Sequence, residues 1–121
     1  MAGLPKKVRL LNKADYNNVF KKSVKVSNSS FLILIHKTSK PYSRLGLVIS
    51  KKVDKRAVQR NRIKRIIRES FRNTNFDIQC DYAVLARGKV TSLENKDIFN
   101  AINKLWFQAQ NKVKQIRKNN E

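Results

Sequence analysis

The alternation of apolar and polar positions along the chain predicts helices and strands in turn. Near the N-terminus, Tyr16, Val19 and Phe20 recur with the i, i+3, i+4 spacing of one helix face. Asn12 precedes them and is placed to cap that helix. Residues 31–38, FLILIHKT, are apolar and β-branched, which is typical of a strand largely buried on both faces. We therefore expect a helix and then a strand.

The same kind of pattern predicts an element in four further segments. Residues 44–50, RLGLVIS, and residues 81–87, DYAVLAR, predict two more strands, and residues 23–30 allow a short additional one. Thr91 and Glu94 have the spacing of a capping box ahead of a last, long helix. The apolar stripe of that helix consists of Ile98, Ile102, Leu105, Ala109, Val113 and Ile116.

Residues 55–72, KRAVQRNRIKRIIRESFR, predict a helix with two unlike faces. Its apolar stripe consists of Ile63, Ile66, Ile67 and Phe71. Arg60, Lys64 and Arg68 follow the edge of that stripe, and the only acid is Glu69, which is spaced to relieve Arg65. Ordinary solvated faces mix both signs of charge, so this one favours binding to a polyanion.

The order α, β, β, α, β, α indicates an α/β (α+β) two-layer sandwich, in which helices cover a small mixed sheet. We expect one domain over residues 1–121, with flexible ends at about 1–8 and 117–121. No linker or internal repeat divides the chain.

Composition narrows the function classes. The chain has 28 Lys and Arg against 8 Asp and Glu, a formal charge of +20, which makes nucleic acid the first expected partner and an anionic membrane surface the rival. No apolar run approaches the roughly 20 residues of a membrane span, and the N-terminus lacks a signal-peptide core. We expect a cytoplasmic protein. The lone cysteine, Cys80, excludes an internal disulfide and reads as a small buried side chain.

Catalytic chemistry is not evident in the residues. The chain has one histidine, His36, no paired acids on one element, and no phosphate-loop, dinucleotide or zinc pattern. We expect no catalytic residue and no metal site. The consistent signal is binding, with Tyr16, Phe20 and Phe31 lining a groove beside the cationic helix, where aromatic rings would stack on unpaired bases. Core packing is the alternative for these rings, and for Phe31 the two readings stay equally open.

Arg60-Asn61-Arg62, extended by Lys64, Arg65 and Arg68, resembles the RNR signature of the bacterial ribonuclease P protein component. Three other segments agree with that family in order and spacing. They are GLVISKK at residues 46–52, DYAVLAR at 81–87 and RLLNKADYNNVFK at 9–21. The resemblance covers essentially the whole chain.

The resemblance implies a sandwich similar to a domain of ribosomal protein S5, with a left-handed crossover through the basic helix, against the general right-handed rule. It also implies that the protein binds the catalytic RNA of ribonuclease P and precursor tRNA, and promotes removal of the 5′ leader. The RNA subunit would carry the active site and require Mg²⁺, while the protein would hold no cofactor. One protein, monomeric when alone, would join each RNA subunit.

Site residues follow from the same resemblance. The RNA-binding residues it implies are Lys51, Lys52, Arg56, Arg60, Asn61, Arg62, Lys64, Arg65 and Arg68. The leader-binding groove would consist of Arg9, Tyr16, Phe20, Phe31, Leu34 and Ser50. Some family members place a further aromatic residue on the first strand, where this chain has Leu32-Ile33-Leu34, so we expect van der Waals contact there in place of stacking.

Three rival functions share some of these features. A structural RNA-binding protein would have the same charge and size but would not affect precursor-tRNA cleavage. A DNA-binding protein would use residues 60–72 as a major-groove helix, but the element before it reads as a strand. A stand-alone nuclease is disfavoured by the shortage of histidines and clustered acids.

Overall fold

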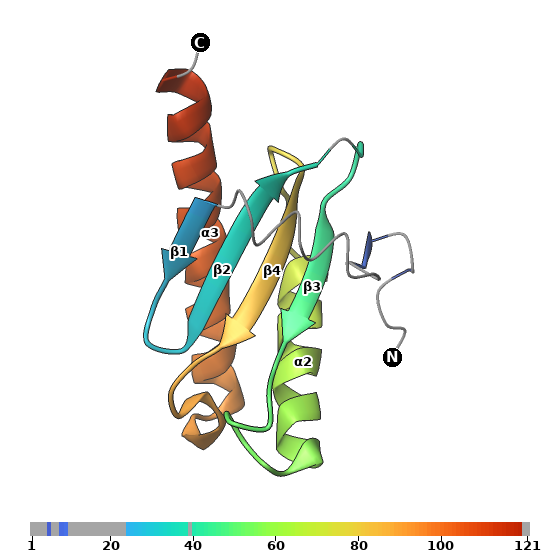
Figure 1. Cartoon of the computed structure of the whole chain (residues 1–121), viewed down its shortest axis with the longest axis vertical. Coiled ribbons are helices and arrows are strands. Elements are labelled where there is room, and N and C mark those ends of the chain that lie inside the picture. The colour runs from blue at the N-terminus through green and yellow to red at the C-terminus, as the bar shows by residue number, and fades with distance from the viewer. Residues whose placement is uncertain (1–4, 6–7, 10–23, 39, 120–121) are drawn as a thin grey trace.

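The computed structural model describes residues 5, 8–9, 24–38 and 40–119 (Figure 1). Its elements are β1 (Val24–Ser27), β2 (Phe31–Lys37), β3 (Arg44–Val48), α2 (Ala57–Arg72), β4 (Cys80–Ala86), the short 3₁₀ helix η2 (Val90–Ser92) and α3 (Asn95–Asn119). β1 confirms the short strand allowed at residues 23–30. The helix expected around Tyr16 and Phe20 lies outside the described residues.

The four described strands form one mixed sheet in the order β1-β2-β4-β3. β1 pairs antiparallel with β2, and β2 pairs antiparallel with β4. β3 pairs parallel with β4, with Leu45 opposite Tyr82 and Leu47 opposite Val84. β4, the last described strand in the sequence, therefore lies between β2 and β3. At the edge of β3 away from β4, Arg9 forms an isolated parallel bridge with Leu45.

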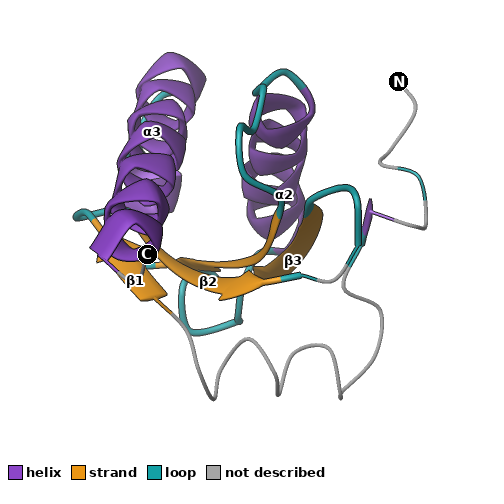
Figure 2. Ribbon diagram, turned by 90° about the horizontal axis from the view of Figure 1, so that it is seen from above, coloured by secondary structure: helices purple, strands orange, loops and turns teal. Residues whose placement is uncertain are grey.

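Both described helices pack on the same face of the sheet (Figure 2). This is the two-layer α+β sandwich that the pattern predicted. In Figure 1, β3 and β4 run downward, α2 returns upward behind the sheet, and β4 lies to the left of β3. That path makes the β3-α2-β4 crossover left-handed, as the family resemblance implied and against the usual preference.

The core lies between the sheet and the two helices. Ile33, Ile63, Ile67, Ile98 and Ile102 have no exposed surface. Four aromatic rings fill one end, with neighbouring ring centres 5.0 to 6.5 Å apart and mostly in edge contacts; they are Phe71, Phe76, Tyr82 and Trp106. The stripe predicted for α3 is confirmed as buried from Ile98 to Ala109, whereas Ile116 near the end of the helix is 38% exposed.

The start of α3 differs from the sequence prediction. Thr91 lies in η2 and does not cap α3, which begins four residues later. The carbonyl of Glu94 accepts hydrogen bonds from the amides of Asp97 (3.0 Å) and Ile98 (3.1 Å). The capping box is wrong because Thr91 contacts residues far away in the sequence, described below. The turn from β4 to η2 passes through Gly88, whose φ of 55° favours glycine.

Neither described helix combines the length and the hydropathy that a bilayer-spanning segment needs.

Candidate nucleic-acid interface

The helix α2 separates apolar from cationic side chains as its sequence predicted. Ile63, Ile66, Ile67 and Phe71 are buried, at most 6% exposed. Away from the core the helix exposes a row with i, i+4, i+7, i+11 spacing, formed by Asn61, Arg65, Arg68 and Arg72. The first turn of α2 contains no acidic residue, and the side chain of Arg56 at the N-cap does not cap the first helix amides.

Three of the cations on α2 have no hydrogen bond or ion pair in the part of the chain that the structure describes. They are Lys64, which is half-buried, and the exposed Arg65 and Arg68. The ion pair expected between Arg65 and Glu69 is not formed, although both side chains border the same hollow between α2 and α3. A cation that precedes an acid by four residues is the weaker orientation on a helix. These three charges remain available to an anionic partner.

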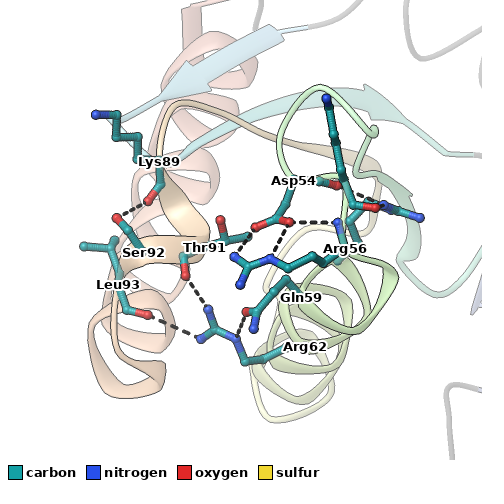
Figure 3. A network of polar contacts seen from close by, with 10 residues as sticks. Asp54, Arg56, Gln59, Arg62, Lys89, Thr91, Ser92 and Leu93 are labelled. Carbon is teal, nitrogen blue, oxygen red and sulfur yellow. Dashed lines mark hydrogen bonds and ion pairs between the residues drawn. The ribbon is translucent and has the colours of Figure 1, made fainter.

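Arg62 has a different role from that of its exposed neighbours. Its guanidinium donates to the carbonyls of Thr91 (2.7 Å) and Leu93 (3.3 Å) and to Asn95 Oδ1 (2.6 Å). It also donates from Nε to Gln59 Oε1 (2.9 Å). Figure 3 shows this side chain reaching from α2 to η2 and the residue after it. Arg62 therefore ties the basic helix to the connection between β4 and α3.

Arg60 is also occupied by the protein itself. Its Nη1 donates to the carbonyls of Asp54 (2.9 Å) and Lys55 (2.8 Å), in the loop that leads into α2. Both arginines of the RNR triplet therefore bond backbone oxygens of this chain. Asn61 between them is exposed.

The loop between β3 and α2 is held by an ion pair at its centre (Figure 3). Arg56 donates to both carboxylate oxygens of Asp54, from Nε (3.0 Å) and from Nη2 (2.8 Å), and its backbone amide donates to Oδ1 (2.9 Å). These hydrogen bonds from Arg56 keep the pKa of Asp54 well below its usual range, and a hydrogen bond from the Thr91 side chain acts in the same direction. The loop is thus fixed while it exposes Ser50, Lys51, Lys52 and Lys55.

The predicted leader groove is only partly supported. Phe31 is fully buried and faces the helices with Ile33 and Ile35, so its assignment to a groove is wrong. Leu34 lies on the opposite face of β2, beside Ala83, but it is only 5% exposed. Two residues of a strand that are three positions apart point to opposite faces, so Phe31 and Leu34 cannot line one groove.

The remaining groove residues are less closely grouped. Arg9 is exposed beside β3, and Ser50 is exposed just beyond the end of that strand. Tyr16 and Phe20 lie outside the described residues.

Sequence reasoning missed a buried ion pair on the sheet face away from the helices. Arg44 donates to both oxygens of Asp81, from Nε (2.8 Å) and Nη2 (2.7 Å), and the Asp81 side chain is 5% exposed. His36 lies opposite Asp81 in the β2–β4 register. Arg44 begins β3 and lies opposite Asp81, the second residue of β4, in the parallel β3–β4 register, which the sequence alone does not give.

Among the described residues, no three His, Cys, Asp or Glu side chains gather in a way that could hold a metal ion. Cys80 is buried, and burial raises the pKa of its thiol.

The fold and this surface define a small, strongly basic α+β sandwich with one cationic helical face, the class of protein that binds polyanions. The ribonuclease P family model matches residues 4–110, and the chain belongs to the ribonuclease P protein family. Among similar curated proteins is the ribonuclease P protein component of Marinomonas sp. (strain MWYL1), 47% identical over 111 residues, 90% of this chain and 84% of the relative. That of Legionella pneumophila (strain Corby) is 41% identical over 106 residues, 88% of this chain and 92% of the relative.

Solved structures agree with this assignment. The ribonuclease P protein of Staphylococcus aureus superposes with a TM-score of 0.80 at 30% identity, over 85% of this chain and 95% of that one. The protein from Thermotoga maritima gives a TM-score of 0.71 at 30% identity, over 81% of this chain and 94% of that one. The family resemblance and the fold class predicted from sequence are therefore confirmed.

Proposed function

We propose that this chain is the RNA-binding subunit of a cytoplasmic ribonuclease P. It binds the catalytic RNA through α2 and the β3–α2 loop, contacts the 5′ leader of precursor tRNA, and so promotes removal of the leader. One protein joins each catalytic RNA.

The observation that carries the proposal is the set of unpaired cations on α2. Lys64, Arg65 and Arg68 lie within two turns of one helix and have no anionic partner among the described residues. Like charges four apart, such as Lys64 and Arg68, each cost a helix roughly 0.2 to 0.5 kcal/mol, a repulsion that phosphates would reverse. Each phosphate contact also releases condensed counterions, which adds salt-sensitive affinity.

Arg60, Arg62 and Arg56 support RNA binding indirectly under this proposal. Their guanidinium groups hold the loop and α2 in place, so they fix the positions from which Lys51, Lys52 and Arg68 reach phosphates. The proposed RNA-binding face thus divides into residues that shape it and residues that contact RNA.

For the leader we propose the sheet face opposite the helices. Of the groove residues predicted from sequence, Arg9 is exposed at the β3 edge of the sheet and Ser50 is exposed just beyond the end of β3, and Tyr16 and Phe20 remain the proposed stacking residues. A single strand bound there would be separated from α2 by the sheet itself (Figure 2). The protein would then contact two RNA molecules on two faces, and its charge of +20 would reduce their mutual repulsion.

Chemistry in this proposal belongs to the catalytic RNA and its Mg²⁺. The described residues gather no set of acids and histidines around one point that could activate water. Protein cations would replace part of the ion atmosphere, so the protein should lower the magnesium concentration that cleavage needs.

Cleavage of a precursor tRNA with a 5′ leader at low magnesium tests the proposal. Protein alone, a bacterial ribonuclease P RNA alone, and both together are compared. We expect cleavage at the mature 5′ end only with both. Cleavage by the protein alone would contradict the expectation that the protein has no catalytic residue. No stimulation of the RNA would favour a structural RNA-binding role instead.

A further inference from the structure

A groove between α2 and α3 shares only Arg65 with the RNA-binding residues proposed above. Two hollows, each of about 380 Å³, lie along it and share Phe99 on their borders. One is bordered by Arg65, Glu69 and Lys96, and the other by Asn103 and Phe107. The volumes fall within the roughly 300 to 1,000 Å³ of small-ligand sites.

The most unusual residue in this groove is Phe107. Its side chain is 67% exposed in the middle of α3, although the neighbouring Trp106 is 1% exposed. Exposed aromatic rings of this size are enriched where a protein meets a partner. Phe99, two turns earlier on α3, is half-buried and borders the same groove.

Polar groups beside these rings suit a nucleobase. Ser70 Oγ donates to Asn103 Oδ1 and accepts a hydrogen bond from Trp106 Nε1 (2.8 Å). Asn103 is thus held through its oxygen, and its amide nitrogen has no acceptor in the described part of the chain. Asn73 and Asn100 also border the groove. An amide can both donate and accept, which the edge of an unpaired base requires.

The charges around the groove match the backbone of a nucleic acid. Arg65 and Lys96 border the end near the start of α3, and Lys104 is exposed on the same helix. Lys96 lies 3.9 Å from Glu94, an exposed pair of little strength. Among the described residues that border the two hollows, Glu69 is the one acid, and it is half-buried.

We propose that this groove binds unpaired nucleotides of the catalytic RNA, with bases stacked on Phe107 and Phe99 and phosphates near Arg65 and Lys96. The inference rests on the proposed function, because Arg65 belongs both to the groove and to the cationic face of α2. The leader is not the occupant, since the proposal above assigns it to the other side of the sheet.

The test compares Phe107→Ala and Phe107→Tyr in the full chain by equilibrium binding to the catalytic RNA. Loss of one base stacked on an aromatic ring should raise Kd by at least about fivefold. We expect Phe107→Ala to raise Kd by about that factor or more, and Phe107→Tyr to stay within about twofold. The matched control is Ile116→Ala, which removes an exposed apolar side chain from the same helix beyond the groove. Its Kd should equal that of the wild type.

Two further readouts separate this inference from the proposed function. In the holoenzyme, the ratio of Kd values for precursor tRNA with and without a leader should be the same for Phe107→Ala and wild type. Trp106 is the only tryptophan and borders the groove, so its emission should change on saturation with catalytic RNA.

An unchanged Kd for Phe107→Ala, alongside weaker binding by Arg68→Ala, would overturn the groove and leave the proposed function standing. Wild-type protein that does not bind catalytic RNA would overturn both. A shift from dimer to monomer in Phe107→Ala, with unchanged RNA affinity, would mean that a second copy of the chain covers the groove.

Discussion

Replacing Arg62 by Ala should destabilise the fold, although Arg62 belongs to the RNR triplet that resembles an RNA-binding signature. The guanidinium bonds the Thr91 carbonyl at 2.7 Å and Asn95 Oδ1 at 2.6 Å, with weaker support at Leu93. A hydrogen bond to a charged group contributes about 1.5 to 3 kcal/mol when well shielded from water. Because the site is half-exposed, we expect Arg62→Ala to lower the free energy of unfolding by about 2 to 3 kcal/mol in total.

Thermal unfolding followed by circular dichroism measures this loss. For a domain of this size, about 2 to 3 kcal/mol corresponds to a fall in Tm of roughly 6 to 12 °C. Arg62→Lys should recover little, because one ammonium group cannot reach acceptors arranged for a planar fork. The control is Arg68→Ala, which removes an exposed cation without a partner in the described residues and should change stability by less than about 0.5 kcal/mol.

The two variants should therefore be distinguished by their stability and by the cause of their weaker RNA binding. Arg62→Ala loses stability, and its RNA affinity falls only because α2 is less well held. Arg68→Ala keeps its stability and loses affinity directly. Suppose instead that Arg62→Ala melted within about 2 °C of the wild type and bound RNA as weakly as Arg68→Ala. The structural role of Arg62 would then be wrong, and Arg62 would be a phosphate ligand.

Three other predictions follow from the described contacts. Lys64→Ala or Arg68→Ala should reduce the steepness of a plot of log association constant against log salt concentration for RNA binding by about 0.7 to 0.9, the value for one phosphate contact. An unchanged slope would place the RNA elsewhere. Asp54→Asn should be less stable than the wild type at pH 7. In the wild type, hydrogen bonds from Arg56 lower the pKa of the Asp54 carboxyl in the folded state. The stabilisation is therefore present above the pKa of the unfolded state, about 3.9, and is lost as the pH falls through the pKa of the folded state. The Tm difference between the two proteins should therefore shrink below about pH 4, and a constant difference would refute this. The buried Tyr82 hydroxyl forms no hydrogen bond with a nitrogen or oxygen atom in the described part, where its polar neighbour is the Cys80 thiol, a weak partner. Burial raises the pKa of Tyr82 above its usual range, and Tyr82→Phe should raise stability by about 1 kcal/mol, measured by thermal unfolding. A lower Tm would reveal a partner for that hydroxyl.

The apolar pattern was enough to predict most of the fold. Ile63, Ile67, Ile98 and Ile102 recur with helical spacing, and all four are fully buried. The short strand β1 carried a weaker signal because its residues alternate between half-buried and exposed. The left-handed crossover came only from the family resemblance, since local residue patterns do not encode the hand of a connection.

The candidate site was predicted less completely, because several of its contacts join residues far apart in the chain. Arg62 and Thr91 are 29 positions apart, and nothing in either neighbourhood predicts their bond. The capping box at Thr91 was wrong because the Thr91 side chain hydrogen-bonds Asp54, 37 positions earlier, and not the start of α3. Phe31 was misplaced for a different reason: in a strand apolar on both faces, alternation does not say which side chains meet the helices. Phe107 lies outside the predicted stripe of α3, and its exposure depends on how α2 and α3 pack together.

The position of β4 in the sheet has a consequence for how the chain acquires its structure during synthesis. β2 and β3 are neighbours in sequence but not in the sheet, because β4 lies between them and supplies the pairing for both. Before Cys80–Ala86 has been synthesised, the only strand pair of the described sheet that the nascent chain can form is therefore the β1–β2 hairpin. The apolar side of β2 is then uncovered. Long-range closure of this kind slows folding relative to a helical domain of equal length. All residues of α2 are synthesised before β4 can complete the sheet that supports them, so during that interval the nascent chain carries the α2 cations without the packing that fixes their positions.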